Sequence, residues 1–178
     1  MIKVIAFDLV GVLITEKDII LNDTEEKIER LFGANESDED YINQAELITN
    51  ENIIDITKNI INKLYVVKDK DIFRKIKEKY TVKIIIATNH VFINKDYIVN
   101  NMEIKNIDDI IISATINKVK PNKDFYEYIL DKYKIKNNEL LFIDDNIENI
   151  NAAASMNINT IKVNKDTDIL LSIKKYME

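Results

Sequence analysis

The chain has 178 residues, of which 46% are hydrophobic and 31% charged, and its formal net charge is -6. This length and composition suit about one globular domain with a self-supporting core and argue against disorder. The absence of cysteine excludes disulfides, thiol catalysis and cysteine metal sites, and the acidic balance gives no electrostatic reason to expect nucleic acid or an anionic membrane as a partner.

The N-terminal segment is apolar, yet its pattern differs from that of a signal peptide. Asp8 interrupts the apolar run, and no small-residue cleavage site follows it. No stretch approaches the roughly 18 apolar residues that a membrane span requires. We therefore expect a soluble, cytoplasmic protein.

Short runs rich in isoleucine and valine predict the strands of a sheet. Each run is only a few residues long and is bounded by polar or turn residues, which is typical of parallel strands that are buried on both faces. The predicted strands are residues 3–7, 82–87, 109–112, 140–143 and 160–163.

Most of the segments between these runs have the periodicity of amphipathic helices. Alternation of strands and helices implies an α/β fold, with a Rossmann-like, doubly wound parallel sheet and helices on both of its faces. The predicted helices of this core are residues 71–80, 122–133, 146–156 and 166–176.

Residues 23–65 break this alternation, because they carry helical patterns and no convincing strand. About 45 residues of helix after the first strand indicate a small cap. We therefore predict a core of residues 1–15 and 68–178 and a helical cap insertion of residues 16–67. The expected N-caps of its first two helices are Asn22 or Asp23, and Ser37.

Polar side chains capable of chemistry stand where the predicted strands end. Ligands of an open parallel sheet bind at the carboxyl ends of its strands, so we expect these side chains to meet at one edge. The residues are Asp8, Thr88, Asn89, Asp144 and Asp145 at strand ends, and Lys120 at the end of a loop.

The carboxylates among these residues need a cation, because clustered carboxylates otherwise repel and protonate. Oxygen ligands without histidine or cysteine favour Mg²⁺, which also binds phosphate oxygens. An aspartate such as Asp8 can attack phosphorus and form an aspartyl-phosphate. Thr88 can bind the oxygens of the transferring group, and Lys120 can neutralise its charge.

Taken in chain order, four segments resemble the motifs of the haloacid dehalogenase (HAD) superfamily. They are FDLVGVL, IIIATNH, Lys120-Pro121 and FIDDNIEN. The resemblance covers roughly residues 1–14 and 70–165 and leaves the inserted helices unmatched in detail. Their location is similar to that of the family's type I caps, which select the substrate.

The resemblance implies a role for each motif residue. Asp8 is implied to be the nucleophile and, with the backbone carbonyl of Val10, a magnesium ligand. Thr88 and Lys120 are implied to bind the phosphoryl group and to be catalytic. The other implied residues are Asn89 in substrate binding, Asp145 as the stronger and Asp144 as the weaker candidate metal ligand, and Asn149 as the matching downstream polar residue.

Val10 departs from the family pattern. Phosphatases of the family carry a second aspartate there, which protonates the leaving oxygen and activates water, steps worth on the order of 10²–10⁴-fold. Dehalogenases and phosphonatases also lack it. Dehalogenases dispense with magnesium, so the retained pair Asp144-Asp145 weighs against them. Phosphonatases use a cap lysine, for which the candidates are Lys17, Lys27, Lys58 and Lys63.

The leading hypothesis is a magnesium-dependent HAD-like phosphatase that acts on a small phosphorylated metabolite through Asp8. The alternatives are a catalytically impaired phosphate-binding or regulatory protein, and a hydrolase of the phosphonatase or dehalogenase type. His90 is a candidate for the missing proton donor, or else an ordinary loop residue. Lys118 competes with Lys120 for the family's lysine position, but Pro121 favours Lys120.

Overall fold

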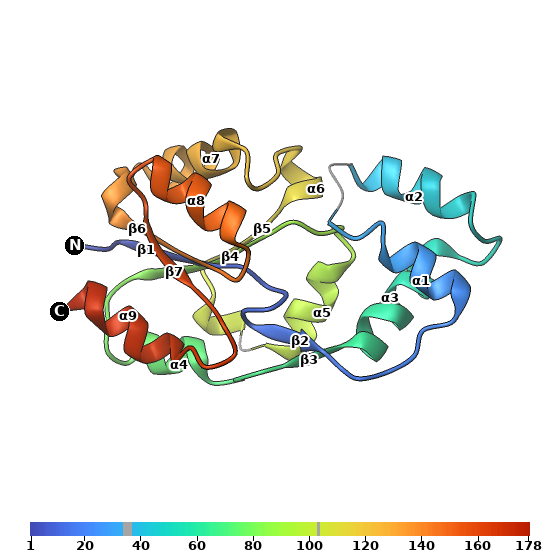
Figure 1. The fold of residues 1–178 in the computed structure, drawn as a ribbon, viewed down its shortest axis with the longest axis horizontal. Helices are drawn as coiled ribbons and strands as arrows, with labels where there is room; N and C mark the ends of the chain where they lie inside the picture. The colour runs from blue at the N-terminus through green and yellow to red at the C-terminus, as the bar shows by residue number, and fades with distance from the viewer. Residues whose placement is uncertain (34–36, 103) are drawn as a thin grey trace.

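The computed structural model describes residues 1–33, 37–102 and 104–178, and a parallel sheet lies at its centre (Figure 1). The sheet has 5 strands in the order β5-β4-β1-β6-β7, so the chain crosses to both sides of β1. This is the predicted α/β fold, with each strand within one residue of its expected bounds. The strands are β1 (Val4–Phe7), β4 (Lys83–Thr88), β5 (Asp109–Ile112), β6 (Leu140–Asp144) and β7 (Asn159–Lys162).

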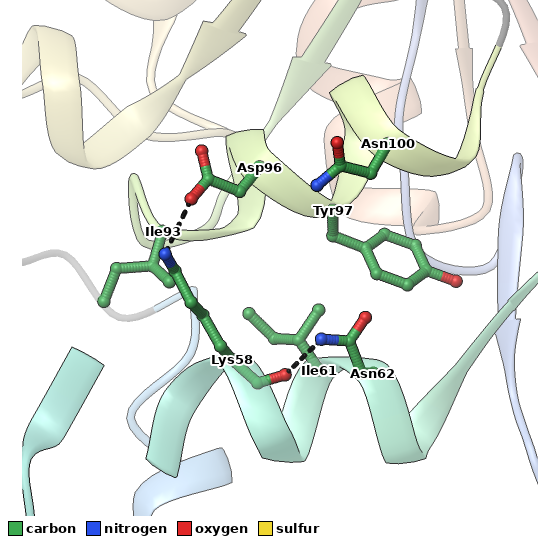
Figure 2. A pocket seen from close by; sticks show the side chains of 7 residues that line it. All are labelled: Lys58, Ile61, Asn62, Ile93, Asp96, Tyr97 and Asn100. Atoms are coloured by element: carbon green, nitrogen blue, oxygen red, sulfur yellow. Dashed lines mark hydrogen bonds and ion pairs between the residues drawn. The ribbon is translucent and has the colours of Figure 1, made fainter. Parts of the chain in front are cut away.

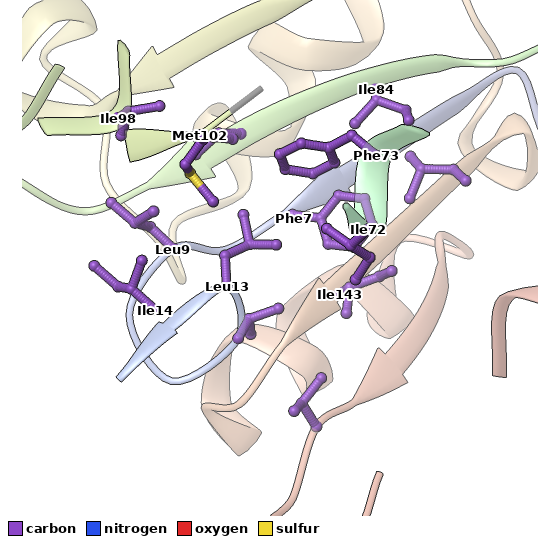
Figure 3. Close-up of a cluster of buried hydrophobic side chains, with 14 of the residues drawn as sticks. Phe7, Leu9, Leu13, Ile14, Ile72, Phe73, Ile84, Ile98, Met102 and Ile143 are labelled. Atoms are coloured by element: carbon purple, nitrogen blue, oxygen red, sulfur yellow. The ribbon is translucent and has the colours of Figure 1, made fainter. Parts of the chain in front are cut away.

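Helices cover both faces of the sheet (Figure 1). Ile5 and Phe7 of β1 belong to the core cluster on the side of α4, α5 and α9, and the Phe7 and Phe73 rings lie 5.5 Å apart (Figure 3). Val4 and Ala6 point to the other face, into the cluster beneath α7 and α8. These helices are α4 (Ile72–Lys77), α5 (Asn94–Asn101), α7 (Lys123–Tyr133), α8 (Ile147–Ser155) and α9 (Ile169–Met177).

Three helices follow the first strand, as expected, and they pack around their own apolar cluster. They are α1 (Asp23–Glu29), α2 (Asp38–Glu46) and α3 (Ile53–Leu64). The side chain of Asn22 accepts hydrogen bonds from the first turn of α1, and that of Ser37 does the same for α2. A capping residue followed by apolar residues at helical spacing is a local signal, which is why the starts of these helices could be predicted from the sequence.

A two-stranded antiparallel ribbon, absent from the sequence prediction, joins these helices to the core. Its strands are β2 (Ile14–Glu16) and β3 (Tyr65–Val67), each 3 residues long. The prediction also lacked α5, which has no side-chain N-cap, and the short elements α6 (Ser113–Ile116), η1 (Ile104–Asn106) and η2 (Asn137–Glu139). Such short segments carry little periodicity.

The three inserted helices contact the core mainly through the segment after β4. The ion pair between Lys58 of α3 and Asp96 of α5 spans 2.9 Å beside Tyr97 (Figure 2). The backbone N–H of Phe92 donates to Asp38 at the start of α2, over 2.7 Å. Within residues 1–33, 37–102 and 104–178, none of the helices has the length and hydropathy of a membrane span.

Candidate active site

The site lies at the carboxyl edge of the sheet, where β1 stands between β4 and β6. Asp8 follows β1 directly, and its backbone N–H donates to the carbonyl of Ile143 over 2.8 Å. Thr88 is the last residue of β4, and Asp144 is the last residue of β6. Parallel pairing of these strands therefore brings the three side chains to one edge, at the point where the strand order reverses.

Lys120 lies between two of the carboxylates. Its Nζ is 2.7 Å from Asp8 Oδ1 and 2.8 Å from Asp144 Oδ2, and its side chain is 1% exposed. The competing lysine, Lys118, instead forms a 3.0 Å ion pair with Asp124, in which both side chains are partly exposed. Of the two lysines, Lys120 is the one that reaches the site.

The charges of the site do not balance. Burial raises the pKa of Asp8; Lys120 opposes this shift and the Asp144 carboxylate adds to it. Burial disfavours the charge on Lys120, but the two carboxylates outweigh it and raise the lysine's pKa. Among the described residues, Lys120 alone forms ion pairs with this group of three carboxylates, which includes Asp145, so negative charge remains for a cation to neutralise.

Asp144 is held in one orientation by a set of donors. Its Oδ1 accepts from the backbone N–H of Asn146 at 2.8 Å. The side-chain amide of Asn149 donates to both of its oxygens, at 3.0 and 3.2 Å. Asn149, which the resemblance matched to Asp145, thus contacts Asp144 in the structure. Because Oδ2 also accepts from Lys120, each oxygen of Asp144 has two donors, and the carboxylate fixes the lysine.

Asp145 has a different environment, exposed and beside Gly11. Within the described residues it has no hydrogen-bond or ion-pair partner. One carboxylate oxygen from each of Asp8, Asp144 and Asp145 nevertheless lies within 4.8 Å of the other two. Gly11 has φ +82, and a Cβ there would lie 2.1 Å from Asp145 Oδ2. Only glycine leaves room for the carboxylate and accepts this backbone conformation.

Thr88 and Asn89 extend the site from the end of β4. Thr88 is buried, 1% exposed. The side chain of Asn89 makes two hydrogen bonds to the backbone of Lys120. Its Nδ2 donates to the lysine carbonyl, and its Oδ1 accepts from the lysine N–H, both over 2.9 Å. The amide expected to bind substrate is therefore engaged with a neighbouring loop.

His90 is buried, and it is poorly suited to donate a proton to a leaving group. Its Nδ1 accepts the backbone N–H of Val91 at 2.9 Å, and its ring lies 5.0 Å from that of Phe32. Nε2 is enclosed without a partner among the described residues. Burial lowers the pKa of His90 to about 4, so the ring is neutral near pH 7.

The sequence reasoning did not include the two glycines. Gly11 contacts Asp145, and Gly33, with φ +74, would bring a Cβ to 3.1 Å from the backbone oxygen of Asn89. The chain contains 2 Gly in all, so both stand beside the site. Their scarcity was the signal available, because a chain that rarely uses glycine retains it where a backbone conformation or a close approach requires it.

The family model of haloacid dehalogenase-like hydrolases matches residues 68–163. The chain belongs to this family. A stretch of 71 residues is 32% identical to bifunctional epoxide hydrolase 2 of Mus musculus and of Rattus norvegicus. The match covers 40% of this chain but only 13% of each of those relatives.

Solved structures of similar fold cover nearly the whole HAD-like chain. A predicted HAD-like family hydrolase from Porphyromonas gingivalis superposes with a TM-score of 0.76 at 18% identity, over 98% of this chain and 97% of that one. A HAD family enzyme from Bacteroides thetaiotaomicron gives 0.78 at 17% identity, over 97% and 98%. Its complex with magnesium and inorganic phosphate gives 0.73 at 18%, over 95% and 98%. At these identities the likeness establishes the fold.

Proposed function

We propose that the protein is a Mg²⁺-dependent phosphohydrolase that acts on a small phosphorylated molecule through an aspartyl-phosphate on Asp8. One observation carries the proposal: Lys120 joins Asp8 to Asp144 at the switch point of the sheet, with the exposed Asp145 beside them. Three carboxylates and one buried ammonium at a ligand-binding edge form a suitable site for a cation and a phosphoryl group.

The donor set fits a magnesium ion. All three side chains offer oxygen, and their spacing of up to 4.8 Å is close to the roughly 4 Å between opposite ligands around Mg²⁺. Asp8 and Asp145, with the Val10 carbonyl, would hold the ion, and Asp144 would support them. When bound, Mg²⁺ offsets the negative charge of the carboxylates and of the phosphoryl oxygens. The Bacteroides thetaiotaomicron enzyme, which binds magnesium and inorganic phosphate, supports this assignment.

The residues of the chain then have separate tasks. An Asp8 oxygen attacks phosphorus, and the bond to the leaving oxygen breaks with its electron pair on that oxygen. Lys120 and Thr88 bind the oxygens of the transferring group. Water next attacks the phosphorus of the aspartyl-phosphate, transfers a proton to the departing phosphate and releases the Asp8 carboxylate. Inorganic phosphate and the dephosphorylated product result.

Neither Val10 nor His90 can readily protonate the leaving oxygen. Val10 has no proton to give, and His90 is neutral, enclosed and bonded through Nδ1 to the backbone. The proposal therefore favours substrates whose leaving group departs without protonation, such as acyl and aryl phosphates. Alkyl phosphates should react more slowly by on the order of 10²–10⁴-fold, the usual worth of a general acid.

The alternatives differ in the support they receive. Val10 favours an impaired, phosphate-binding protein as the second candidate. A phosphonatase is disfavoured, because its covalent lysine should be free to face Asp8. Three of the four candidate lysines are engaged elsewhere: Lys58 pairs with Asp96, Lys63 with Glu25, and Lys17 with the carbonyl of Asn62. The fourth, Lys27, is exposed on α1. We also infer that residues 16–67 form a substrate-selecting cap and that residues 1–15 and 68–178 form the catalytic core.

The test is hydrolysis of a panel of substrates with added Mg²⁺. The panel contains an activated aryl phosphate, an acyl phosphate, an alkyl phosphate and a phosphonate, and Asp8→Asn is assayed beside the wild type. We expect the aryl and acyl phosphates to be hydrolysed, EDTA to abolish turnover, and Asp8→Asn to be inactive. Inorganic phosphate binding without turnover of any ester favours the second candidate, and full turnover by Asp8→Asn contradicts the nucleophile assignment.

A further inference from the structure

We infer that Asn89 is a positioning residue for Lys120, holding the backbone of that lysine so that its ammonium reaches the phosphoryl group. This role differs from direct binding of substrate by the Asn89 side chain, and it rests on the proposed function. The observation behind it is the reciprocal pair of 2.9 Å hydrogen bonds between the Asn89 amide and the N–H and C=O of Lys120.

The backbone of Lys120 needs such a partner. Lys120 is 4% exposed and lies outside every helix and strand, so sheet or helix hydrogen bonds do not satisfy its peptide groups. A buried N–H or C=O is costly when left unpaired. The planar amide of Asn89 supplies one acceptor and one donor to the same residue, which fixes the position of Lys120 relative to β4.

The side chain of Lys120 depends on that position. Its Nζ contacts Asp8 and Asp144 at 2.7 and 2.8 Å, and a shift of the lysine backbone would move the ammonium away from one of them. Short charge-assisted contacts of this kind require well-defined geometry. Asn89 therefore acts on the phosphoryl site through Lys120.

Asn89 is itself confined from the opposite side by the inserted helices. A Cβ on Gly33 would come within 3.1 Å of the Asn89 backbone oxygen, so the backbone at Gly33 lies directly against it. Three residues further on, the N–H of Phe92 donates to Asp38 of α2. The segment that carries Asn89 thus rests between the inserted helices and the Lys120 loop, which limits how far the amide can move.

The test is a double-mutant cycle read out as affinity for inorganic phosphate in the presence of Mg²⁺. Asn89→Leu keeps the approximate shape of the side chain but removes both hydrogen bonds, and Lys120→Ala removes the ammonium. We expect Asn89→Leu to weaken phosphate binding on the order of tenfold in the wild-type background and less than twofold in the Lys120→Ala background. Equal losses in both backgrounds would mean that Asn89 contacts phosphate itself and would overturn the inference.

A second measurement follows the contact without phosphate or turnover. Amide hydrogen exchange at Lys120 should be slow in the wild type, remain slow in Asn89→Asp, which keeps the acceptor oxygen, and become fast in Asn89→Leu. Fast exchange in the wild type would overturn the inference even where the double mutant fails to fold. Slow exchange in a wild type that binds no phosphate would leave the contact intact and contradict the proposed function alone.

Discussion

The carboxylate of Asp145 occupies the space that a side chain on Gly11 would fill. A Cβ at Gly11 would lie 2.1 Å from Asp145 Oδ2, and the glycine has φ +82. The turn that follows β1 and the turn that follows β6 are therefore in close contact at a single glycine. This contact places the backbone next to Val10 beside the exposed Asp145 carboxylate.

Gly11→Ala should weaken Mg²⁺ binding by at least tenfold, because the methyl group displaces Asp145 and strains the turn. Isothermal titration calorimetry with Mg²⁺ measures the loss. The matched control is Gly33→Ala, which has φ +74 and therefore a comparable strain, but contacts the Asn89 carbonyl. The control should lose stability and retain its Mg²⁺ affinity. Equal losses of affinity in the two variants would contradict a specific role for Gly11.

Lys120→Met should destabilise the metal-free protein by about 3 kcal/mol or more, because two buried carboxylates lose their counter-charge. Added Mg²⁺ should restore part of this loss, since it binds the folded state. Urea unfolding with EDTA and with Mg²⁺ measures both effects. Lys118→Met is the control: its ion pair with Asp124 is partly exposed, so its loss should cost less than about 1 kcal/mol. Similar losses for the two lysines would argue against the bridging role of Lys120.

His90 should make the protein less stable in acid. Its pKa falls from 6.5 to about 4 on burial, so between these values the unfolded chain binds a proton that the folded chain excludes. The free energy of unfolding therefore decreases as pH falls through this window, by about 1.4 kcal/mol per unit and roughly 3 kcal/mol in total. Above the unfolded value the contribution is constant.

Unfolding of the wild type and of His90→Asn at several pH values measures this contribution. Asparagine can keep an acceptor for the Val91 N–H but does not titrate. The difference between the two curves removes the titration of other groups and should show the predicted slope. A constant difference across the window would mean that the ring is accessible to protons, which would reopen a catalytic role for it.

Val10→Asp should accelerate hydrolysis of alkyl phosphates more than that of aryl phosphates. An aspartate two residues after the nucleophile can protonate the leaving oxygen, and only poor leaving groups need that proton. We expect a gain in kcat on the order of 10–10²-fold for an alkyl phosphate and only a few-fold for an activated aryl phosphate. Val12→Asp is unsuitable as a control because Val12 is buried, so wild type and Asp8→Asn serve instead. The same gain for both substrates would argue against leaving-group protonation.

The sequence predicted the parallel sheet and most of its helices because their signals are local. Buried strands appear as short apolar runs, and helices such as α1 and α2 begin at capping residues that the structure retains, Asn22 and Ser37. The ribbon of β2 and β3 was missed for the opposite reason. Each strand has 3 residues, and its partner lies at the far end of the inserted helices. Because the pairing is long-range and short, neither segment alone has a sequence pattern that predicts a strand.

By itself, the sequence determined which side chains could meet: Asp8, Thr88, Asp144 and Asp145 end predicted parallel strands, and such ends share one edge. Only the tertiary structure decided what each one touches. In the structure, Asn149 donates to Asp144, the Asn89 amide is hydrogen-bonded to the backbone of Lys120, and His90 is buried. The contact between Asn89 and Lys120 joins residues far apart in the chain, and all of these features depend on side-chain orientation and burial, which strand periodicity does not encode.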